Sequence, residues 1–186
     1  FVLDGHKALI TAGSTSDVAM IVARTDPSGG KSGISVFITP TDNPGYQVLT
    51  KERKLGHRTN DTCQVRFESM RVPTTDLLGP EGRGLSIALG GLSLGRIGVA
   101  AQSVGGARQA LRLSKQYAEE RSTFGKAIIE HQAVAFQLAE MATEVEVGRQ
   151  MYLHAATLQD QGLDSISAAS MAKLYASEMA ERVASR

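Results

Sequence analysis

The spacing of apolar residues changes once along this chain, and the change divides it into two parts. Residues 1–78 alternate apolar and polar side chains in short runs separated by Gly, Pro, Asn and Ser, which is typical of antiparallel strands. From about Leu85 onward, apolar residues recur every three or four positions, as on one face of a helix. We therefore predict an α+β protein, with a small β domain over 1–78 and a helical bundle domain over 79–186.

The β part contains closely spaced strand candidates with no helix between them. Asp4-Gly5 divides the first apolar-alternating run, and because both residue types tolerate positive φ it predicts a hairpin there. The further strand candidates are 18–24, 33–39, 46–50 and 63–69. This spacing predicts a small antiparallel barrel or sandwich, incomplete at its N-terminus because Phe1 already stands inside a strand.

The helical part predicts an antiparallel four-helix bundle of which this chain holds three helices. The helical patterns run through 97–118, 134–155 and 168–183. Gly162 is expected to end the second helix, and Asp164 or Ser165 to cap the third. The third pattern is unfinished at Arg186, so we expect the chain to be a fragment of a longer protein.

Composition argues against several classes of function. Lys plus Arg number 20 and Asp plus Glu 19, so no basic face predicts a nucleic-acid partner. Cys63 is the only cysteine, which rules out an internal disulfide and fits a reducing compartment. His6, His57 and His154 lack the spacing of a metal site, so we expect no metal.

Segments that would direct the chain into or across a membrane are not apparent. No run approaches the roughly 18 apolar residues of a membrane span, and no signal-peptide pattern is present. We therefore expect a protein that is neither secreted nor membrane-spanning.

Glycines are concentrated at the entry to the helical part, with nine between Gly79 and Gly106. Each costs a helix interior about 1 kcal/mol relative to Ala, so their density needs a reason. Two interpretations stay open: small residues allow helices to pack closely, or the missing Cβ allows a ligand to approach the backbone.

The junction 117–136, YAEERSTFGKAIIEHQAVAF, joins the first two helical patterns. Arg121 offers a planar fork suited to phosphate oxygens, and Ser122 and Thr123 add hydroxyl donors. Lys126 adds a second cation close to the expected helix start near Ile129, where free N–H groups favour an anion.

An aromatic and an amide extend the same junction. Phe124 supplies an aromatic face and Gln132 an amide, so the set would suit the diphosphate and adenosine of a dinucleotide. A structural alternative is that Arg121 and Lys126 pair with Glu119 or Glu120, or face solvent. Glu144 and Glu146, in the second helix, are interpreted as solvated side chains.

This junction resembles the Y-x-x-x-R-x-x-F-G-x-x-(I/L)-x-x-x-Q segment of the acyl-CoA dehydrogenase family. The resemblance spans the chain, since further matching segments occur in order. They are LDGHKALITAGSTSDVAMIVARTD, GISVFIT, PGYQV, KLGHRTNDT, FESMRVP, LLGPEGRG and GRIGVAAQSVGGARQAL.

The resemblance implies a flavoenzyme that binds FAD and assembles as a homotetramer, a dimer of dimers. It places Ile10 and Thr11 along the isoalloxazine, with Thr11 hydrogen-bonded to flavin N5, and it places Leu9 beside them. The residues expected at the diphosphate and adenosine of a neighbouring subunit's FAD are Arg121, Thr123, Phe124, His131 and Gln132.

Three positions depart from the family pattern. Leu9 stands where the family usually has Trp, which affects electron exit to a partner. Ser93 stands where the family prefers Asp. In relatives, that Asp and the counterpart of Arg96 contact the pantetheine of acyl-CoA. Ser93 and Arg96 are therefore the expected substrate-binding residues. Gly95 occupies one of the two places where relatives carry the catalytic Glu. No catalytic residue is therefore expected in this chain, and the base Glu is expected after Arg186.

The reaction implied is α,β-dehydrogenation of an acyl-CoA thioester to trans-2-enoyl-CoA, with electrons passed to electron-transfer flavoprotein. The expected location is the bacterial cytoplasm or the mitochondrial matrix. Two alternatives stay open: an acyl-CoA oxidase or nitroalkane oxidase on the same scaffold, and a non-catalytic helical assembly protein.

Overall fold

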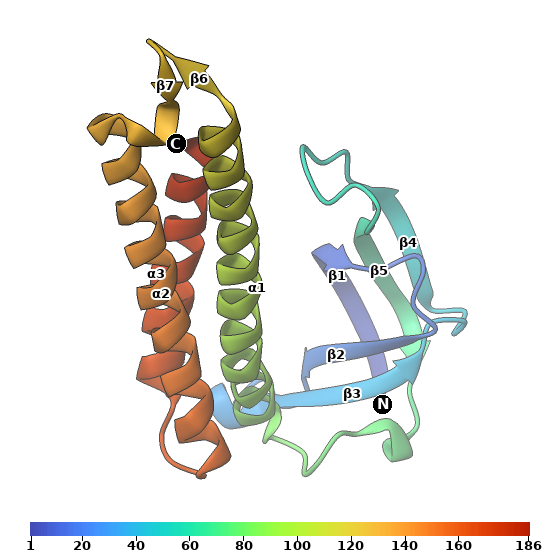
Figure 1. Cartoon of the computed structure of the whole chain (residues 1–186). Coiled ribbons are helices and arrows are strands. Elements are labelled where there is room, and N and C mark those ends of the chain that lie inside the picture. The colour runs from blue at the N-terminus through green and yellow to red at the C-terminus, as the bar shows by residue number, and fades with distance from the viewer. The chain divides into compact units, whose positions relative to one another are not determined.

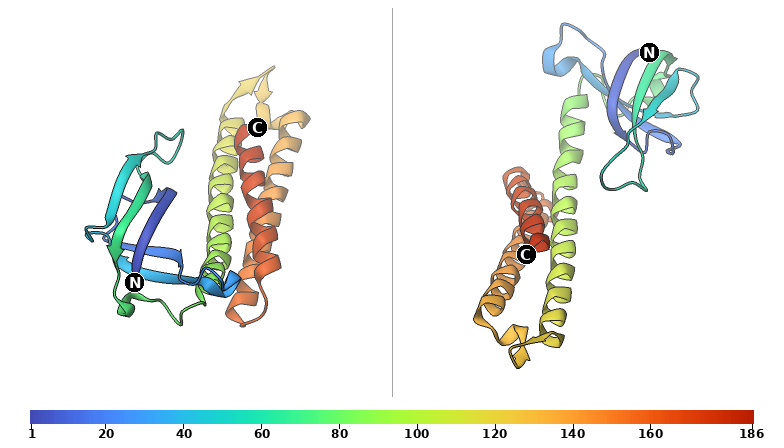
Figure 2. Two further views of the ribbon diagram at one scale, coloured as in Figure 1. Left: turned by 180° about the vertical axis from the view of Figure 1, so that it is seen from behind. Right: turned by 90° about the horizontal axis from the view of Figure 1, so that it is seen from above.

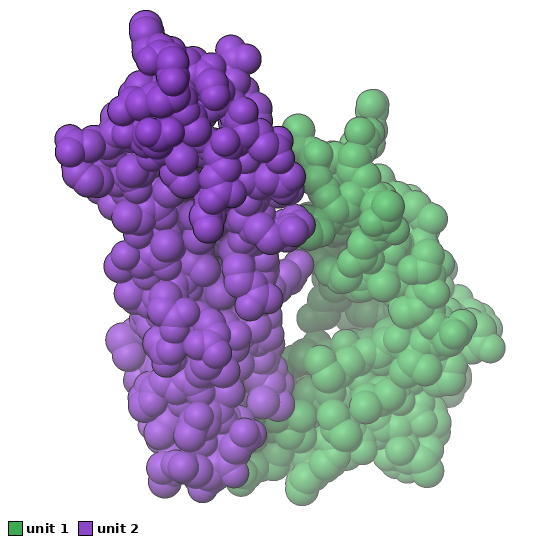
Figure 3. Space-filling view, in the orientation of Figure 1, with its two compact units in different colours: residues 1–89 green, residues 90–186 purple.

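The computed structural model describes all residues 1–186, and the α+β class is confirmed (Figure 1). The chain divides into two compact units, Phe1–Leu89 and Gly90–Arg186, which Figure 3 shows in different colours. The first unit holds the strands β1 to β5, and the second holds nearly all of the helical structure.

Two antiparallel sheets form the first unit. Strands β1 (Val2–Thr11), β5 (Thr62–Arg71) and β4 (Tyr46–Lys51) make a three-stranded sheet in that order. Strands β2 (Val18–Arg24) and β3 (Ile34–Pro40) make a two-stranded sheet that runs across the first (Figures 1 and 2). The predicted strands after residue 17 are confirmed, and the sheets do not close into a barrel.

The hairpin predicted at Asp4-Gly5 is wrong, because β1 runs through it as one strand paired with β5. Gly5 instead lies in a bulge: the register shifts between Leu3 and Gly5, and Gly5 has a φ of 154°. The Asp4 carboxylate accepts a hydrogen bond from the Ser69 N–H at 2.7 Å. A bulge and a hairpin turn use the same conformational freedom of glycine, so the dipeptide alone did not distinguish them.

Both sheets contribute to one apolar core. Phe37 of β3 and Val65 and Met70 of β5 are fully buried, and Leu3 and Ile21 pack with them. Burial of such side chains contributes about 1.5–3 kcal/mol each. The alternation along the first part of β5 follows from the face of this strand that meets the core, whereas β3 buries three successive residues, Ser35 to Phe37.

Three helices build the second unit: α1 (Gly84–Glu120), α2 (Gln132–Asp160) and α3 (Ile166–Ser185). Their shared core is centred on small and sulfur-containing side chains, including Ala100, Val104, Met141, Ala176 and Met179. Three antiparallel helices were predicted, and their existence is confirmed.

The turn between α2 and α3 follows the predicted capping chemistry. Gly162 has a φ of 69° and donates its N–H to the Gln159 carbonyl, which is the glycine C-terminus expected of a helix. The Asp164 carboxylate then accepts the Ile166 N–H at 3.0 Å, and Ser165 is the N-cap residue of α3.

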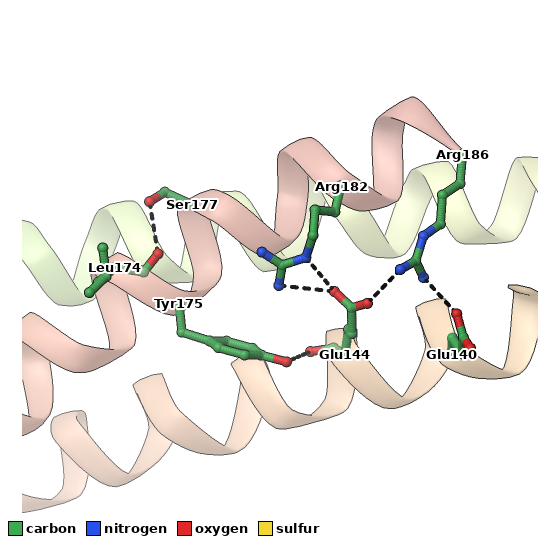
Figure 4. A network of polar contacts seen from close by, with 7 residues as sticks. All are labelled: Glu140, Glu144, Leu174, Tyr175, Ser177, Arg182 and Arg186. Carbon is green, nitrogen blue, oxygen red and sulfur yellow. Dashed lines mark hydrogen bonds and ion pairs between the residues drawn. The ribbon is translucent and has the colours of Figure 1, made fainter.

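An ion-pair network joins α2 to α3 and corrects the interpretation of Glu144 as a solvated side chain (Figure 4). The Glu144 carboxylate forms ion pairs with the guanidinium groups of Arg182 and Arg186, each with an N–O distance of 3.1 Å. The Arg186 guanidinium also lies 3.4 Å from the Glu140 carboxylate. Only 20% of the Glu144 side chain is exposed. The helix period placed Glu144 on a polar edge, but the arginines that face it lie 38 and 42 residues later in the chain.

Helix α1 alone has the length and composition of a membrane-crossing helix, with an 18-residue window of mean hydropathy 1.4. The helix contains no unbroken run of about 18 apolar residues, because Gly, Ser and Arg96 interrupt it. One such helix is weak evidence, since core helices of soluble proteins meet the same criterion.

The glycines between 79 and 106 serve more than one purpose. A Cβ at Gly82 would lie 2.3 Å from the Ser32 carbonyl oxygen, and one at Gly84 would lie 2.5 Å from the Ser35 carbonyl carbon. Gly82, in the turn before α1, permits close contact with η1 (Gly30–Gly33), and Gly84, the first residue of α1, permits close contact with the start of β3. The other helical glycines of this stretch meet no atom within 4 Å of a built Cβ: Gly90, Gly91, Gly95, Gly98, Gly105 and Gly106.

Candidate cofactor site

A short hairpin replaces a simple loop between α1 and α2. Strands β6 (Ser122–Thr123) and β7 (Lys126–Ala127) pair around the two-residue turn Phe124-Gly125. Phe124 has a φ of 53° and Gly125 a φ of 82°, and positive φ at both positions is the signature of a type I′ turn. For a residue with a Cβ this left-handed conformation costs about 1–2 kcal/mol.

The strained Phe124 does not bury its ring in the chain, since it is 97% exposed. Its one aromatic neighbour is His131, whose ring lies edge-on with centroids 6.2 Å apart. An exposed aromatic that is held at a conformational cost is characteristic of a binding position.

The hairpin brings three of the predicted cofactor residues together. His131 Nε2 lies 3.4 Å from both the hydroxyl and the carbonyl oxygen of Thr123. Together with the His131–Phe124 ring contact, this places Thr123, Phe124 and His131 in one cluster. Gln132 is exposed and is the first residue of α2. This helix starts at Gln132 rather than near Ile129, because the short helix η3 (Ile128–Glu130) intervenes.

Arg121 stands at the base of this hairpin with an exposed side chain that forms no ion pair in the chain. The two acidic residues before it have other partners: Glu119 pairs with Lys115 at 3.5 Å, and Glu120 accepts Gln116 at 2.9 Å. Pairing of Arg121 with Glu119 or Glu120 is therefore not seen, whereas the other half of the structural alternative, that Arg121 faces solvent, agrees with its exposed side chain. The guanidinium keeps its donors available for an anionic ligand.

The strand end Leu9–Thr11 lies in the first unit and contains a second bulge. The register of β1 against β5 shifts between Lys7 and Ile10, and Leu9 has a φ of 58°. Leu9 is consequently 70% exposed, while Ile10 packs against the core and Thr11 is exposed. The bulge thus displays an apolar side chain and a hydroxyl at the end of the strand.

The turn that follows Thr11 is organised by Asp61, a residue that sequence reasoning did not select. The Asp61 carboxylate accepts the N–H and the hydroxyl of Ser14, at 2.9 and 2.6 Å, and the Thr15 hydroxyl at 3.2 Å. It also accepts the Cys63 thiol at 3.1 Å. These hydrogen bonds, led by the Ser14 hydroxyl, hold the pKa of Asp61 far below its usual range.

The thiol beside Asp61 is affected in the opposite direction. Burial, with the hydrogen bond to Asp61 and its charge, raises the pKa of the Cys63 thiol. Cys63 is therefore a neutral donor to this turn. The only sequence signal for the arrangement was the turn-forming run Thr59-Asn60-Asp61 before β5.

The predicted substrate-binding pair lies on α1. Ser93 is buried and Arg96 is half-buried, and their spacing of three residues puts them on one side of the helix. Gly95 between them faces open space. No group of three or more His, Cys, Asp or Glu side chains that could hold a metal ion is present.

The donor chemistry of the two segments fits a dinucleotide cofactor. The hairpin offers a free guanidinium, a hydroxyl and an exposed ring, which suit a diphosphate and a base. The strand end offers an exposed apolar side chain and a hydroxyl, which suit the flat edge of a fused ring.

Both halves of the chain match descriptions of one enzyme family. Residues 1–70 match "Acyl-CoA dehydrogenase, middle domain", and residues 82–186 match "Acyl-CoA dehydrogenase, C-terminal domain". The chain therefore belongs to the acyl-CoA dehydrogenase family.

Two curated relatives illustrate the match. An acyl-CoA dehydrogenase of Bacillus subtilis (strain 168) is 43% identical over 184 residues, which is 99% of this chain and 48% of the relative. The caffeyl-CoA reductase-Etf complex subunit CarC of Acetobacterium woodii is 39% identical, over 100% of this chain and 49% of its own length. The chain thus spans about half the length of the curated relatives it matches.

Solved structures share the fold. Butyryl-CoA dehydrogenase from Megasphaera elsdenii has a TM-score of 0.93 and 38% identity, covering 98% of this chain and 48% of that one. PigA with FAD and proline has a TM-score of 0.92 and 31% identity, covering 96% and 47%. The prolyl acyl carrier protein oxidase AnaB has a TM-score of 0.91 and 34% identity, covering 96% and 47%.

Proposed function

We propose that this chain is part of an FAD-dependent acyl-CoA dehydrogenase that converts an acyl-CoA thioester to trans-2-enoyl-CoA. The observation that carries the proposal is the hairpin at 122–127, with a strained, exposed Phe124 in its turn and an unpaired Arg121 directly before its first strand. A family scaffold that had lost its cofactor would have no reason to retain this conformational cost.

FAD would be held at two places by this chain. Leu9, Ile10 and Thr11 would lie along the isoalloxazine, with the Thr11 hydroxyl donating to flavin N5. Arg121, Thr123 and Phe124 would bind the diphosphate and adenosine of the FAD of a neighbouring subunit, with His131 and Gln132 close by. When bound, FAD supplies the acceptor for the hydride that leaves the β carbon.

The substrate would be bound in part by α1. The Arg96 side chain would contact the pantetheine region, with Ser93 in place of the usual carboxylate. A Glu beyond Arg186 would remove the α proton, since burial in an apolar site raises the pKa of a carboxyl toward neutrality. The 186-residue chain alone is therefore expected to be inactive, and turnover by this chain with any acyl-CoA would contradict that expectation.

The assembled enzyme would be a homotetramer, a dimer of dimers, that passes electrons to electron-transfer flavoprotein. The relative CarC is a subunit of a complex that contains Etf, which supports this electron acceptor. The proposed location is the bacterial cytoplasm or the mitochondrial matrix.

FAD titration of the full-length protein tests the proposal. Arg121→Ala removes a charge-assisted contact worth about 1.5–3 kcal/mol, so FAD should bind about 10- to 100-fold more weakly. Arg112→Ala is the matched control, because Arg112 is an exposed α1 residue that bonds only Gln109. A wild-type protein that is colourless and takes up no FAD would overturn the proposal and favour a non-catalytic assembly protein.

A second candidate function is an oxidase in which oxygen accepts the electrons. Leu9 favours it, because the exposed side chain at this bulge is aliphatic rather than an indole, and the oxidase AnaB shares the fold. Oxygen consumption by the full-length protein with an acyl-CoA, measured against reduction of electron-transfer flavoprotein, separates the two functions.

A further inference from the structure

We propose that Asp61 is a positioning residue for the flavin: it fixes the turn after Thr11 and thereby holds Ile10 and Thr11 in the orientation that FAD requires. The inference rests on the proposed FAD site, and it concerns a residue that does not itself contact the cofactor. Its basis is the set of hydrogen bonds that Asp61 accepts from Ala12, Ser14 and Thr15, in the turn directly after Thr11.

Asp61 holds the turn through both its side chain and its main chain. The carboxylate accepts Ser14 twice and Thr15 once, and the Asp61 carbonyl accepts the Ala12 N–H at 3.0 Å. A carboxylate that accepts several donors is a strong and directional anchor. Ala12, Ser14 and Thr15 are therefore tied to one residue, which directly precedes β5.

The backbone of this segment is unusual enough to need such an anchor. Leu9 and Ala12 both have positive φ, of 58° and 55°, so the chain leaves the ordinary strand conformation on each side of Ile10 and Thr11. Each such residue costs about 1–2 kcal/mol. The conformation persists only where surrounding contacts fix it.

The opposite side of the turn is fixed by packing that leaves little freedom. A Cβ at Gly13 would lie 2.8 Å from Cys63 Cβ, and the Tyr46 hydroxyl donates to the Gly13 carbonyl at 2.9 Å. Asp61 fixes the other side of the turn by accepting hydrogen bonds from Ser14 and Thr15. Loss of its charge would free Ser14 and Thr15 while Gly13 stayed packed.

Apolar burial holds the strand end only through Ile10, which packs against the core. Leu9 and Thr11 are exposed, and Ile10 is only partly buried, so few core contacts determine where these side chains point. Strand pairing of Ile10 with Cys63 and of Thr11 with Thr62 fixes their backbone on one side, and the hydrogen bonds of Asp61 to Ala12, Ser14 and Thr15 fix the turn that follows them. A shift of about 1 Å in such a positioning element is enough to weaken binding or reaction strongly.

The test compares Asp61→Asn with wild type in the full-length protein. The amide keeps the size of the carboxylate and loses its charge and one acceptor oxygen. We expect FAD to bind about tenfold more weakly, in line with the loss of a supporting hydrogen-bond partner at a bound group. We also expect a shifted flavin absorption band and a shifted flavin midpoint potential in the fraction that retains FAD.

The controls separate positioning from folding. Asp42→Asn makes the same chemical change at an exposed residue of the β3–β4 turn, and should leave FAD affinity, spectrum and potential unchanged. A merely structural role for Asp61 would lower the unfolding temperature of the apoprotein but leave the spectrum and potential of bound FAD at wild-type values. That result would overturn the inference.

A second variant covers the case in which Asp61→Asn does not fold. Ser14→Ala removes the 2.6 Å hydrogen bond from the Ser14 hydroxyl to the Asp61 carboxylate. It should lower the affinity for FAD about threefold, with a smaller spectral shift in the same direction as in Asp61→Asn. If the Ser14→Ala variant binds FAD with the affinity, absorption spectrum and midpoint potential of the wild type, the positioning role is refuted. A wild-type protein without FAD would instead refute the proposed function.

Discussion

Phe124 concentrates conformational strain at a single residue that has little to stabilise it within the chain. We predict that Phe124→Gly stabilises the apoprotein by about 0.5–1 kcal/mol. Relief of the left-handed conformation contributes about 1–2 kcal/mol, and the greater freedom of Gly in the unfolded chain offsets about 0.5–1 kcal/mol of it. Chemical unfolding of the apoprotein measures the difference.

Phe124→Gly should also lower the affinity for FAD about tenfold, because stacking of a base on an aromatic ring is worth about 1–3 kcal/mol. Gly125→Ala is the matched variant, since Gly125 has a φ of 82° and open space around it. It should destabilise the apoprotein by about 1 kcal/mol. Phe124→Gly with lower stability and unchanged FAD affinity would show that Phe124 has a structural role only.

The depressed pKa of Asp61 makes a pH-dependent contribution to stability. Its unfolded pKa is about 3.9 and its folded pKa lies far lower, because Ser14, Cys63 and Thr15 donate to the carboxylate. A lowered folded pKa gives stability that is fully present above the unfolded pKa and is lost as the pH falls toward the folded one.

We therefore predict that wild type exceeds Asp61→Asn in stability by a constant margin from pH 7 to pH 5, and that this margin narrows below about pH 4. Urea unfolding at several pH values measures the margin, with Asp42→Asn as the comparison. A margin that stays constant down to pH 3 would show that the hydrogen bonds do not depend on the ionised form.

Individual residues differ in how far the sequence could predict their roles. Arg121 and Phe124 act within a segment of a few residues, so their spacing suggested a site for a diphosphate and a base, but the β6–β7 hairpin that carries them was not predicted. Asp61 acts on Ser14, which lies 47 residues away, and no local pattern encodes such a contact. The resemblance to the family supplied the expected cofactor, which the residues by themselves left open.

At the scale of elements, α2 and α3 are joined by a polar contact as well as an apolar core. We predict that Glu144→Gln lowers stability by about 1–2 kcal/mol, because it leaves Arg182 and Arg186 without their shared carboxylate. The value lies between that of exposed pairs and that of fully buried ones, as the partial exposure of these side chains requires.

The control for this network lies two positions further on the same helix. Glu146 pairs with Arg149 and Gln150 on an exposed surface, so Glu146→Gln should change stability by no more than about 0.5 kcal/mol. Thermal unfolding at low and high salt measures both variants. Equal effects of the two substitutions would show that the Glu144 network contributes no more than an ordinary surface pair.

The elements also show where pattern reading ends. Strand and helix periods located β2 to β5 and α1 to α3, because each period reflects which side of the element meets a core. The same patterns led to the wrong prediction of a hairpin at Asp4-Gly5, because glycine is favoured both in hairpin turns and in β-bulges. The pairing partner decides between a bulge and a turn, and it lies at Phe67 in β5.

At the scale of the whole molecule, many large apolar side chains of the helical unit remain exposed in the single chain, including Leu94, Phe136, Val147, Met171 and Leu174. Surfaces of this kind are typical of interaction sites. The proposed tetramer would cover such surfaces, and would bring the hairpin of one subunit to the FAD of another.

A cofactor bound across subunits makes binding and assembly thermodynamically linked. We predict that the full-length protein binds FAD about tenfold more weakly once it is diluted below the concentration at which the tetramer dissociates. Removal of FAD should in turn lower that assembly affinity by about the same factor for each FAD that the tetramer binds, because the coupling is reciprocal at each site. Flavin fluorescence at a series of protein concentrations, paired with light scattering of the apo and FAD-loaded forms, measures both sides of the linkage. In Arg121→Ala, FAD binding and subunit assembly should become nearly independent, while Arg112→Ala should behave as wild type. An FAD affinity that is the same for the tetramer and for dissociated subunits would show that each FAD is bound by one subunit alone.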